Sequence, residues 1–599
     1  MRSLFQLLRD SPQRSRLVLL GLIAVLAAML GFVTFTPRQV KPWIVAGAYY
    51  YIFAVFALFS FYAWKLLRSR RAVWIGWLRH PGWAGAVLLT ATAFTLWADP
   101  FEHKVLFDEF VLQATAQHFH DTKEFGAVVR AYDIAGTWLA IDSFMDKRPY
   151  FFVFLVSLLH DLTGFRLANI FIVNVMLTPV FLALAYWLGR ELTSRGPALF
   201  AVGLLATLPL LAQNATGAGM ELHNLAMIAL VCVLATLYLR APDEDRLAAL
   251  VLGTVLLAQS RYESVIFVLP AAFVIVAGWR RVGRVLLPWP ALIAPLLFVP
   301  YAWHNRVLSA SPVLWQLKSG QTSRFGLGYL RENLEGAWIF FFNRTPALAN
   351  SFYLSVLGGL GLGWALWRGW RWWRRSVEPS TPSALVLAVF GAMIAGNLGL
   401  LMFYYWSRLD EVIASRFALP MCFLLALFAA LLLEGLGAWR ALALRLAALG
   451  LIAWLFVGAL PAMAYRAYTE DNLVMHEVNW QHDILVRRPG SVLFLSNSST
   501  IPFVLWRIPT ILISVGAMRG SQIAYHMREG TFKEVIVAQA LRPTTTEGDR
   551  GIDPDDLLPA SFHLEPVVEK RFGGRWVRLS RIVSIDEAPV GKPAIVATP

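Results

Sequence analysis

The stretch LLAQSRYESVIFVLPAAFVIV, residues 256–276, interrupts a long apolar segment with the polar sequence Gln259–Glu263. As a single helix, 247–279 would cross a membrane once, whereas two helices over 247–260 and 264–279 would cross it twice. A membrane-spanning helix needs about 20 mostly apolar residues, so length alone allows both interpretations. Whether this segment forms one helix or two decides on which side of the membrane every later loop lies.

Composition places the chain among membrane proteins. Of its 599 residues 57% are hydrophobic and only 15% are charged, with 24 Trp and 40 Phe and a mean hydropathy of +0.56. This is too little charge to cover a soluble protein, so we predict a polytopic membrane protein. The net charge of +15 falls in brief clusters between apolar runs, which indicates cytoplasmic loops and no nucleic-acid partner. The two cysteines, Cys232 and Cys422, lie inside apolar runs and exclude a disulfide-stapled exterior domain.

The basic loops settle the topology. If 247–279 were one helix, every later basic cluster would lie outside, against the positive-inside rule. With two helices, all the basic clusters and the basic N-terminus lie in the cytoplasm. We interpret the N-terminus as the start of a first helix that is retained in the mature protein. We therefore predict about thirteen transmembrane helices with the C-terminus outside. The predicted runs are 17–35, 43–63, 83–98, 167–189, 196–212, 223–240, 247–260, 264–279, 285–303, 350–368, 382–404, 416–434 and 444–464.

Three segments do not span. Exterior loop 99–166 contains RPYFFVFLVSLLHDLTGF, which we interpret as an interfacial helix, and exterior loop 304–349 contains the amphipathic YLRENLEGAWIFFF. From 466 onward, the runs SVLFLSN, TILISV and EVIVAQAL predict strands, and a hairpin is expected to turn at Gly573–Gly574. The predicted division is two N-terminal helices with a cytoplasmic loop in 1–82, a membrane module in 83–465 and an exterior α/β domain in 466–599.

An acidic pair, Asp108 and Glu109 in KVLFDEFVLQA, follows an apolar run closely. Carboxylates against apolar surface are costly unless they have a partner or a task, and desolvation raises their pKa toward the range useful for a general base. The alternative interpretation is an ordinary polar loop edge. The nearby His103, His118 and His120 suggest a divalent metal only weakly, so no cofactor is firmly predicted.

Basic residues gather at helix ends on the same side, where positive charge is generally depleted. For each one, snorkelling of the side chain to lipid headgroups is the alternative. Together they predict an exterior-facing site for an anion that arrives in the membrane. The anion-binding candidates are Lys147, Arg148, Arg261 and Arg416, and the candidates for lining the site are Tyr262, Glu263, His304, Arg306 and Tyr405.

An ordered set of segments resembles the GT-C membrane glycosyltransferases, particularly the group of protein O-mannosyltransferases and the lipid A aminoarabinose transferase. The matching segments, over most of 83–440, are FDEF, KRPYFFVFLVSLLHDLTGF, RLANIFIVNVMLTPVFLALAYWLGREL, LLAQSRYESVIFVLPAAFVIV and ASRFALPMCFLLALFAAL. Two spans precede the one leading to Asp108, and Arg148-Pro149-Tyr150 stands where the family has a basic residue and two prolines. These departures leave the subfamily, sugar and acceptor open.

The resemblance implies an inverting transferase on the periplasmic face of a bacterial inner membrane. It would move a sugar from a polyprenyl-phosphate donor to a hydroxyl group of a glycan, lipid or protein acceptor. By position, Asp108 would be the general base with Glu109 its neighbour, while Arg148, Arg261 and Arg416 would hold the donor phosphate or line the site. The competing classes are a transporter or lipid-linked sugar flippase, expected to carry mid-span charges and repeated broken helices, and a scaffold.

Overall fold

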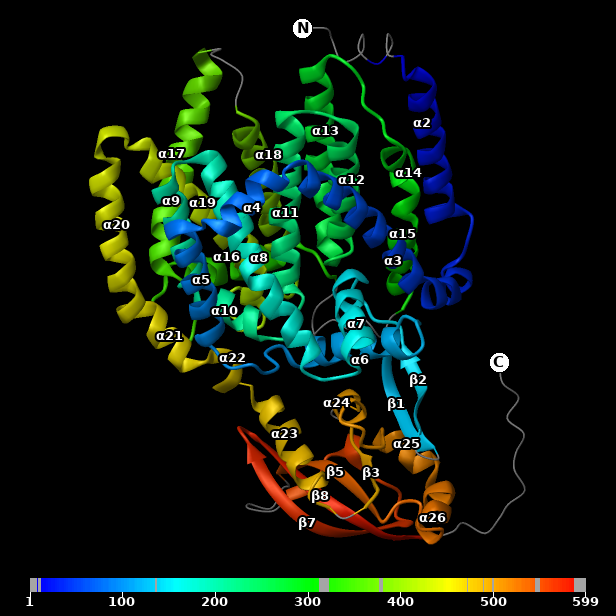
Figure 1. Ribbon diagram of the computed structural model, residues 1–599. Helices are drawn as coiled ribbons and strands as arrows, with labels where there is room; N and C mark the ends of the chain where they lie inside the picture. The colour runs from blue at the N-terminus through cyan, green and yellow to red at the C-terminus, as the bar shows by residue number, and fades with distance from the viewer. Residues whose placement is uncertain are drawn as a thin grey trace. The chain divides into compact units, whose positions relative to one another are not determined.

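The computed structural model describes residue 8 and residues 12–134, 137–311, 323–375, 381–470, 472–488, 490–497, 500–543 and 550–586. The chain forms two compact units (Figure 1). The helical unit comprises Met1–Val105, Phe119–Phe125 and Asp146–Glu470. The sheet unit comprises Leu106–His118, Gly126–Met145 and Asp471–Pro599.

Long apolar helices build the helical unit. Within the described residues, eight helices are long and apolar enough to cross a membrane, or nine if α9 (Arg195–Ala206) and α10 (Pro209–Thr216), bent by 66°, form one span. The predicted polytopic α-helical class with a C-terminal α/β domain is confirmed, while the number thirteen stays a prediction. The eight are α2 with η1 (Arg14–Val33), α3 (Pro37–Ser69), α8 (Asn169–Leu192), α11 (Glu221–Arg240), η2 with α13 (Tyr262–Val282), α18 (Pro382–Leu401), η5 with α19 (Ala414–Gly435), and Gly437–Glu470.

Further helices complete the unit. Two apolar ones are α5 (Gly82–Trp97) and α7 (Phe151–Thr163). Of these, α7 corresponds to the predicted interfacial helix and α5 to the predicted span 83–98. The others are α4 (Arg71–Arg79), α12 (Glu244–Ala258), α14 (Trp289–Leu297), α15 (Val299–Ser309), α16 (Leu330–Phe342) and the longer α17 (Phe352–Arg375). The span Gly437–Glu470 contains α20 (Arg440–Trp454), α21 (Leu460–Tyr465) and α22 (Ala467–Glu470).

The segment 247–279 forms two helices, as predicted. Helix α12 ends at Ala258, Arg261 adopts an extended backbone, and the 3₁₀ helix η2 (Tyr262–Phe267) leads into α13 (Val268–Val282). Pro270 lies in the first turn of α13, where its missing N–H costs no intrahelical hydrogen bond. The turn therefore places Arg261 between the end of α12 and the start of η2.

Two predicted single spans are broken, and proline explains both breaks. The run 285–303 forms α14 and α15, which join at Phe298, two residues before Pro300. The run 196–212 bends between α9 and α10, where Leu208 is extended immediately before Pro209. Pro300 removes a backbone donor in the first turn of α15, and Pro209 in addition disfavours helical backbone at Leu208, so an apolar run can be continuous while its helix is not.

Helix α11 lies at the core of the helical unit. Nearly all of its residues are buried, and it packs against α8, α12, α13 and α18. A helix that is apolar on every side is expected to be enclosed by others. Elsewhere in the unit, Gly358 and Gly361 let α17 approach α19 so closely that a Cβ at either would collide with backbone of Leu425 or Phe428.

The predicted loop 99–166 contains more structure than its sequence suggested. Helix α6 (Leu106–Asp121) carries the acidic pair, and β1 (Ala127–Ile134) pairs antiparallel with β2 (Thr137–Phe144). The alternation of β1 and β2 is weak, which is why the hairpin was not predicted. By its contacts, α6 is divided between the two units at His118.

The C-terminal α/β domain is confirmed. Its sheet has the order β4-β3-β5-β8-β7, with β6 paired to β5. Buried apolar clusters cover both faces, one including Val478 and Phe503 and the other Ile513 and Ile523. The hairpin turns at Gly573, whose φ of 58° suits glycine. The strands are β3 (Val492–Leu495), β4 (Thr510–Ile511), β5 (Glu534–Pro543), β6 (Arg550–Ile552), β7 (Phe562–Phe572) and β8 (Arg575–Ile585), and the helices are α23 (Leu473–Leu485), α24 (Ile501–Leu505), α25 (Ile513–Met518) and α26 (Gly520–Arg528).

Candidate active site

Two of the predicted arginines converge on one buried carboxylate in the helical unit. Arg261 Nη1 lies 3.2 Å and Arg416 Nη1 2.9 Å from Oε1 of Glu221. A second carboxylate, Glu263, places its Oε1 2.5 Å from Arg261 Nε. The side chains of Arg261, Arg416 and Glu221 are at most 7% exposed, so water screens these charges little.

Three helix ends bring this cluster together. Glu221 is the first residue of α11, where the helix N-terminus favours a negative charge. Arg261 occupies the turn after α12, and Arg416 lies in the 3₁₀ helix η5 (Ala414–Ala418) that precedes α19. The ring of Phe417 contacts both guanidinium groups, its centroid lying 5.0 Å from Arg261 Cζ and 5.6 Å from Arg416 Cζ. Residues distant in sequence thus form one charged centre within apolar surroundings.

A hydrogen bond fastens η2 to α11 beside the cluster. Ser264 Oγ donates to Asn224 Oδ1 at 2.6 Å, and Asn224 lies one helical turn beyond Glu221. The cavity lined by Glu221, Arg261 and Arg416 has a volume of about 10 Å³, room for about one water molecule. In this arrangement both arginines are paired with carboxylates, and a phosphate could bind them only by displacing a carboxylate.

Arg148 belongs to a neighbouring buried cluster. Its Nη1 lies 2.7 Å from Oδ1 of Asp146, and the Asp146 carbonyl oxygen is 2.7 Å from Nε2 of His304. The N–H of Phe151, three residues after Arg148, donates to the carbonyl of Gln259 at 3.0 Å. The start of α7 is therefore joined directly to the turn that carries Arg261. Lys147, beside Arg148, is half-buried.

The remaining predicted lining residues are dispersed. The carbonyl of Tyr262 accepts a hydrogen bond from the Tyr301 hydroxyl. Tyr405 lines a cavity of about 480 Å³ together with Tyr329 and Trp406. Arg306 donates from Nη1 to the carbonyl of Gly31 at 2.9 Å, and so contacts the N-terminal helices.

The acidic pair lies in the first turn of α6, where the helix dipole stabilises ionised carboxylates. Glu109 is buried and Asp108 is half-buried. By its contacts this part of α6 belongs to the sheet unit, whereas Arg261 and Arg416 belong to the helical unit. The joint role of the pair and the arginines stays a prediction.

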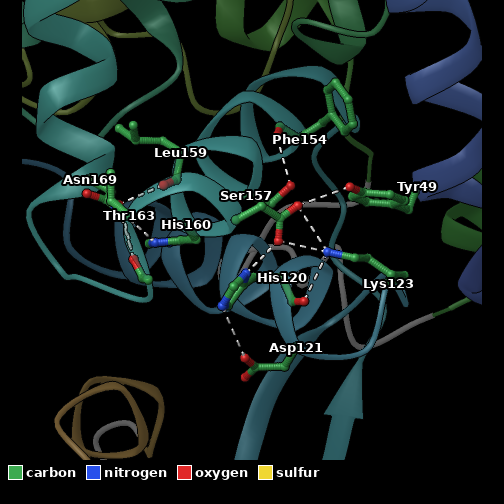
Figure 2. A network of polar contacts seen from close by, with 12 residues as sticks. Tyr49, His120, Asp121, Lys123, Phe154, Ser157, Leu159, His160, Thr163 and Asn169 are labelled. Carbon is green, nitrogen blue, oxygen red and sulfur yellow. Dashed lines mark hydrogen bonds and ion pairs between the residues drawn. The ribbon is translucent and has the colours of Figure 1, made fainter.

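A second polar cluster surrounds Asp161 at the end of α7, and Figure 2 shows its partners pointing toward one another. Lys123 Nζ donates to its two oxygens at 2.8 and 3.0 Å, His120 Nδ1 lies 2.6 Å from Oδ1, and the Tyr49 hydroxyl donates at 3.2 Å. Burial raises the pKa of the Asp161 carboxyl, but the hydrogen bonds from Lys123 and His120 outweigh it and hold that pKa below its ordinary value. Burial lowers the pKa of neighbouring His160 to about 4.

The three histidines considered as metal ligands have other contacts: His120 Nδ1 lies 2.6 Å from Asp161 Oδ1, His118 Nδ1 lies 3.2 Å from the Gly126 carbonyl oxygen, and the ring of His103 packs against Phe171. No group of three or more His, Cys, Asp or Glu suited to a metal occurs among the residues that the structure describes.

Sequence reasoning missed Glu221, the residue that joins the two arginines. One signal was available, because an acidic residue at the entrance to an apolar helix is costly and so has a partner or a function. Asp146 was missed in the same way, although it directly precedes Lys147 and Arg148.

Comparison with protein families supports the class of protein. Residues 147–304, about a quarter of the chain, match the family described as dolichyl-phosphate-mannose-protein mannosyltransferase. The match includes Arg148, Glu221 and Arg261, and it confirms the resemblance to GT-C glycosyltransferases. It supports glycosyl transfer by a multi-pass membrane protein. No curated protein sequence matches significantly.

Two solved structures are among those similar to this chain. ArnT from Cupriavidus metallidurans bound to undecaprenyl phosphate is 13% identical, with 84% of this chain and 98% of that chain covered and a TM-score of 0.49. Archaeal oligosaccharyltransferase AglB from Archaeoglobus fulgidus, in complex with an inhibitory peptide and a dolichol-phosphate, is 12% identical, with 77% and 70% covered and a TM-score of 0.42. Likeness at this level assigns neither a ligand nor a residue role to this chain.

Proposed function

We propose that this protein is an inverting glycosyltransferase that moves a sugar from a polyprenyl-phosphate donor to a hydroxyl acceptor on the periplasmic face of the inner membrane. The observation that carries the proposal is the convergence of Arg261 and Arg416 on Glu221 in apolar surroundings. Two buried guanidinium groups at one point suit a phosphate, because each presents a planar fork of donors that stays charged when desolvated.

The chemistry would proceed in one displacement. The acceptor oxygen attacks the anomeric carbon while the Asp108 carboxylate takes its proton, with Glu109 beside it. The bond between the anomeric carbon and the phosphate oxygen breaks, and its electron pair stays on that oxygen. A single attack from the opposite face inverts the anomeric configuration.

The arginines would act where charge accumulates. As the glycosidic bond breaks, negative charge grows on the phosphate oxygens, and fixed cations stabilise this transition state more than the ground state. The small cavity beside Glu221 implies that donor binding displaces a carboxylate from Arg261 or Arg416. Arg148, linked to the same turn through Phe151 and Gln259, would complete the anion site with Lys147.

The experiment compares Arg261→Ala and Arg261→Lys with wild type in purified full-length protein. We expect Arg261→Ala to lower turnover about 10²–10³-fold, as for loss of one oxyanion donor, and to weaken polyprenyl-phosphate binding. Arg261→Lys keeps the charge but loses the fork, and should be intermediate. The control is Arg344→Ala, since exposed Arg344 stacks on Phe352 with its Cζ 4.2 Å from the ring centroid. Wild-type turnover and lipid affinity in Arg261→Ala would overturn the proposal.

One observation favours the competing transporter or flippase function. The 66° bend between α9 and α10 is a broken helix, a feature common in transporters. Reconstitution in liposomes with a fluorescent polyprenyl-phosphate sugar separates the two functions. The proposed transferase glycosylates an acceptor without moving the lipid between leaflets.

A further inference from the structure

A large apolar cavity opens between the N-terminal helix α2 and the helices α13 to α15, all in the helical unit. Its volume is about 860 Å³, within the usual range of ligand pockets. The walls are mostly small or apolar side chains such as Ala24, Ala28 and Val268, while the polar lining residues include Asn305 and Arg306 near the end of α15. The shape suits a hydrocarbon chain with a polar group at one end.

The N-terminal helix fixes the charged end of this cavity. Residues Met29–Val33 form the π-helix η1, whose wider turn is rare and frequently marks functional sites. Trp303 Nε1 donates to the carbonyl of Leu30 at 2.8 Å, and Arg306 Nη1 donates to that of Gly31 at 2.9 Å. The guanidinium of Arg306 is thus fixed at the cavity by a specific backbone contact.

The charge of Arg306 is not cancelled within the described part of the chain. Its hydrogen-bond partner there, the Gly31 carbonyl, is neutral, and no carboxylate in the described residues pairs with it. A cation beside an apolar cavity in a membrane protein is costly without an anion, and an anionic lipid headgroup supplies one. Ordinary snorkelling would explain the charge but neither the cavity nor the fixed guanidinium.

We infer that this cavity binds an anionic glycerophospholipid, with its phosphodiester on Arg306 and one acyl chain between α2 and α13. The site is separate from the proposed donor site and does not depend on the proposed transfer reaction. The short helix η2 divides them, because Ser264 and Phe267 line the arginine cavity whereas Val265 lines this one.

The bound lipid would support the segment that carries Arg261. Tyr301 lines the cavity and donates its hydroxyl to the carbonyl of Tyr262, the residue after Arg261. An acyl chain against Val265 and Val268 packs behind η2, and its binding to the folded protein stabilises that state.

The test measures lipid retained by the purified full-length protein in detergent, by native mass spectrometry, after exchange with phosphatidylglycerol, phosphatidylcholine or polyprenyl phosphate. We expect wild type to retain phosphatidylglycerol in preference to phosphatidylcholine. Arg306→Gln should weaken phosphatidylglycerol binding about tenfold, as expected for loss of a charge-assisted hydrogen bond. The matched control Arg344→Gln should behave as wild type.

A cavity-filling pair tests the chain site independently of Arg306. Ala24→Phe places a ring in the cavity and should abolish selective retention, whereas Val25→Phe, at an exposed position on the same helix and outside the lining, should not. Phosphatidylglycerol should also raise the unfolding temperature of wild type more than that of Ala24→Phe. Equal retention of both phospholipids by wild type, or unchanged retention in Arg306→Gln and Ala24→Phe, overturns the inference. Polyprenyl phosphate retained in place of phosphatidylglycerol, with the same dependence on these two residues, also overturns it.

Discussion

Replacing Glu221 with glutamine removes the negative charge shared by Arg261 and Arg416 while keeping the size of the side chain. In the wild-type protein one oxygen of Glu221 lies 3.2 and 2.9 Å from the two guanidinium groups. Removing one partner of a buried ion pair costs about 3–5 kcal/mol, because the remaining charge stays buried without compensation. Glu263 still pairs with Arg261, so we expect a loss of stability near the lower end of that range.

The informative result is the response to polyprenyl phosphate. If its phosphate binds where the Glu221 carboxylate lies, the lipid restores the missing anion in Glu221→Gln and no longer competes with a carboxylate. The unfolding temperature of Glu221→Gln in detergent should therefore be below that of wild type, and added polyprenyl phosphate should raise it by more than it raises the wild-type value.

The matched control is Glu434→Gln. Glu434 also pairs with an arginine of the helical unit, its Oε1 lying 2.7 Å from Arg440 Nη1, but it lies at the C-terminal end of α19, the end opposite to Arg416, and is partly exposed. Polyprenyl phosphate should not stabilise this variant more than wild type. Equal stabilisation of wild type, Glu221→Gln and Glu434→Gln would refute the idea that phosphate replaces the Glu221 carboxylate.

Three further predictions concern the base, the Asp161 cluster and the topology. Asp108→Asn should lower single-turnover transfer about 10²–10⁴-fold and leave donor binding unchanged, and near-normal transfer would remove Asp108 from the mechanism. Because the folded-state pKa of Asp161 is lowered, its stabilisation is present above the ordinary aspartate pKa and is lost as pH falls through the folded value. Unfolding temperatures of wild type and Asp161→Asn should thus converge in acid, and a gap independent of pH would contradict this. A cysteine at exposed Thr122 should react with an impermeant reagent from outside, and one at Ser69 only after permeabilisation, whereas the reverse labelling would invert the topology.

Much of the architecture was predictable because hydrophobicity and charge act locally. The apolar runs, the basic loops and the polar turn at Arg261 are properties of short segments, and they were enough to predict two helices over 247–279. The C-terminal domain was predictable for the same reason, since the runs 491–497 and 534–541 alternate with turns and a glycine pair. The hairpin of β1 and β2 lacks such a pattern and went unrecognised.

The sequence by itself determined the membrane class, the helical segments and the candidate residues Asp108, Arg148 and Arg261, because each follows from local composition or from a motif. Only the tertiary structure decided that Glu221 joins Arg261 to Arg416, and that Arg306 instead contacts Gly31. The physical reason is that a charge in an apolar unit must find its partner through space. That partner is set by the packing of helices such as α11 and α12, and chain order does not record which of their ends come together.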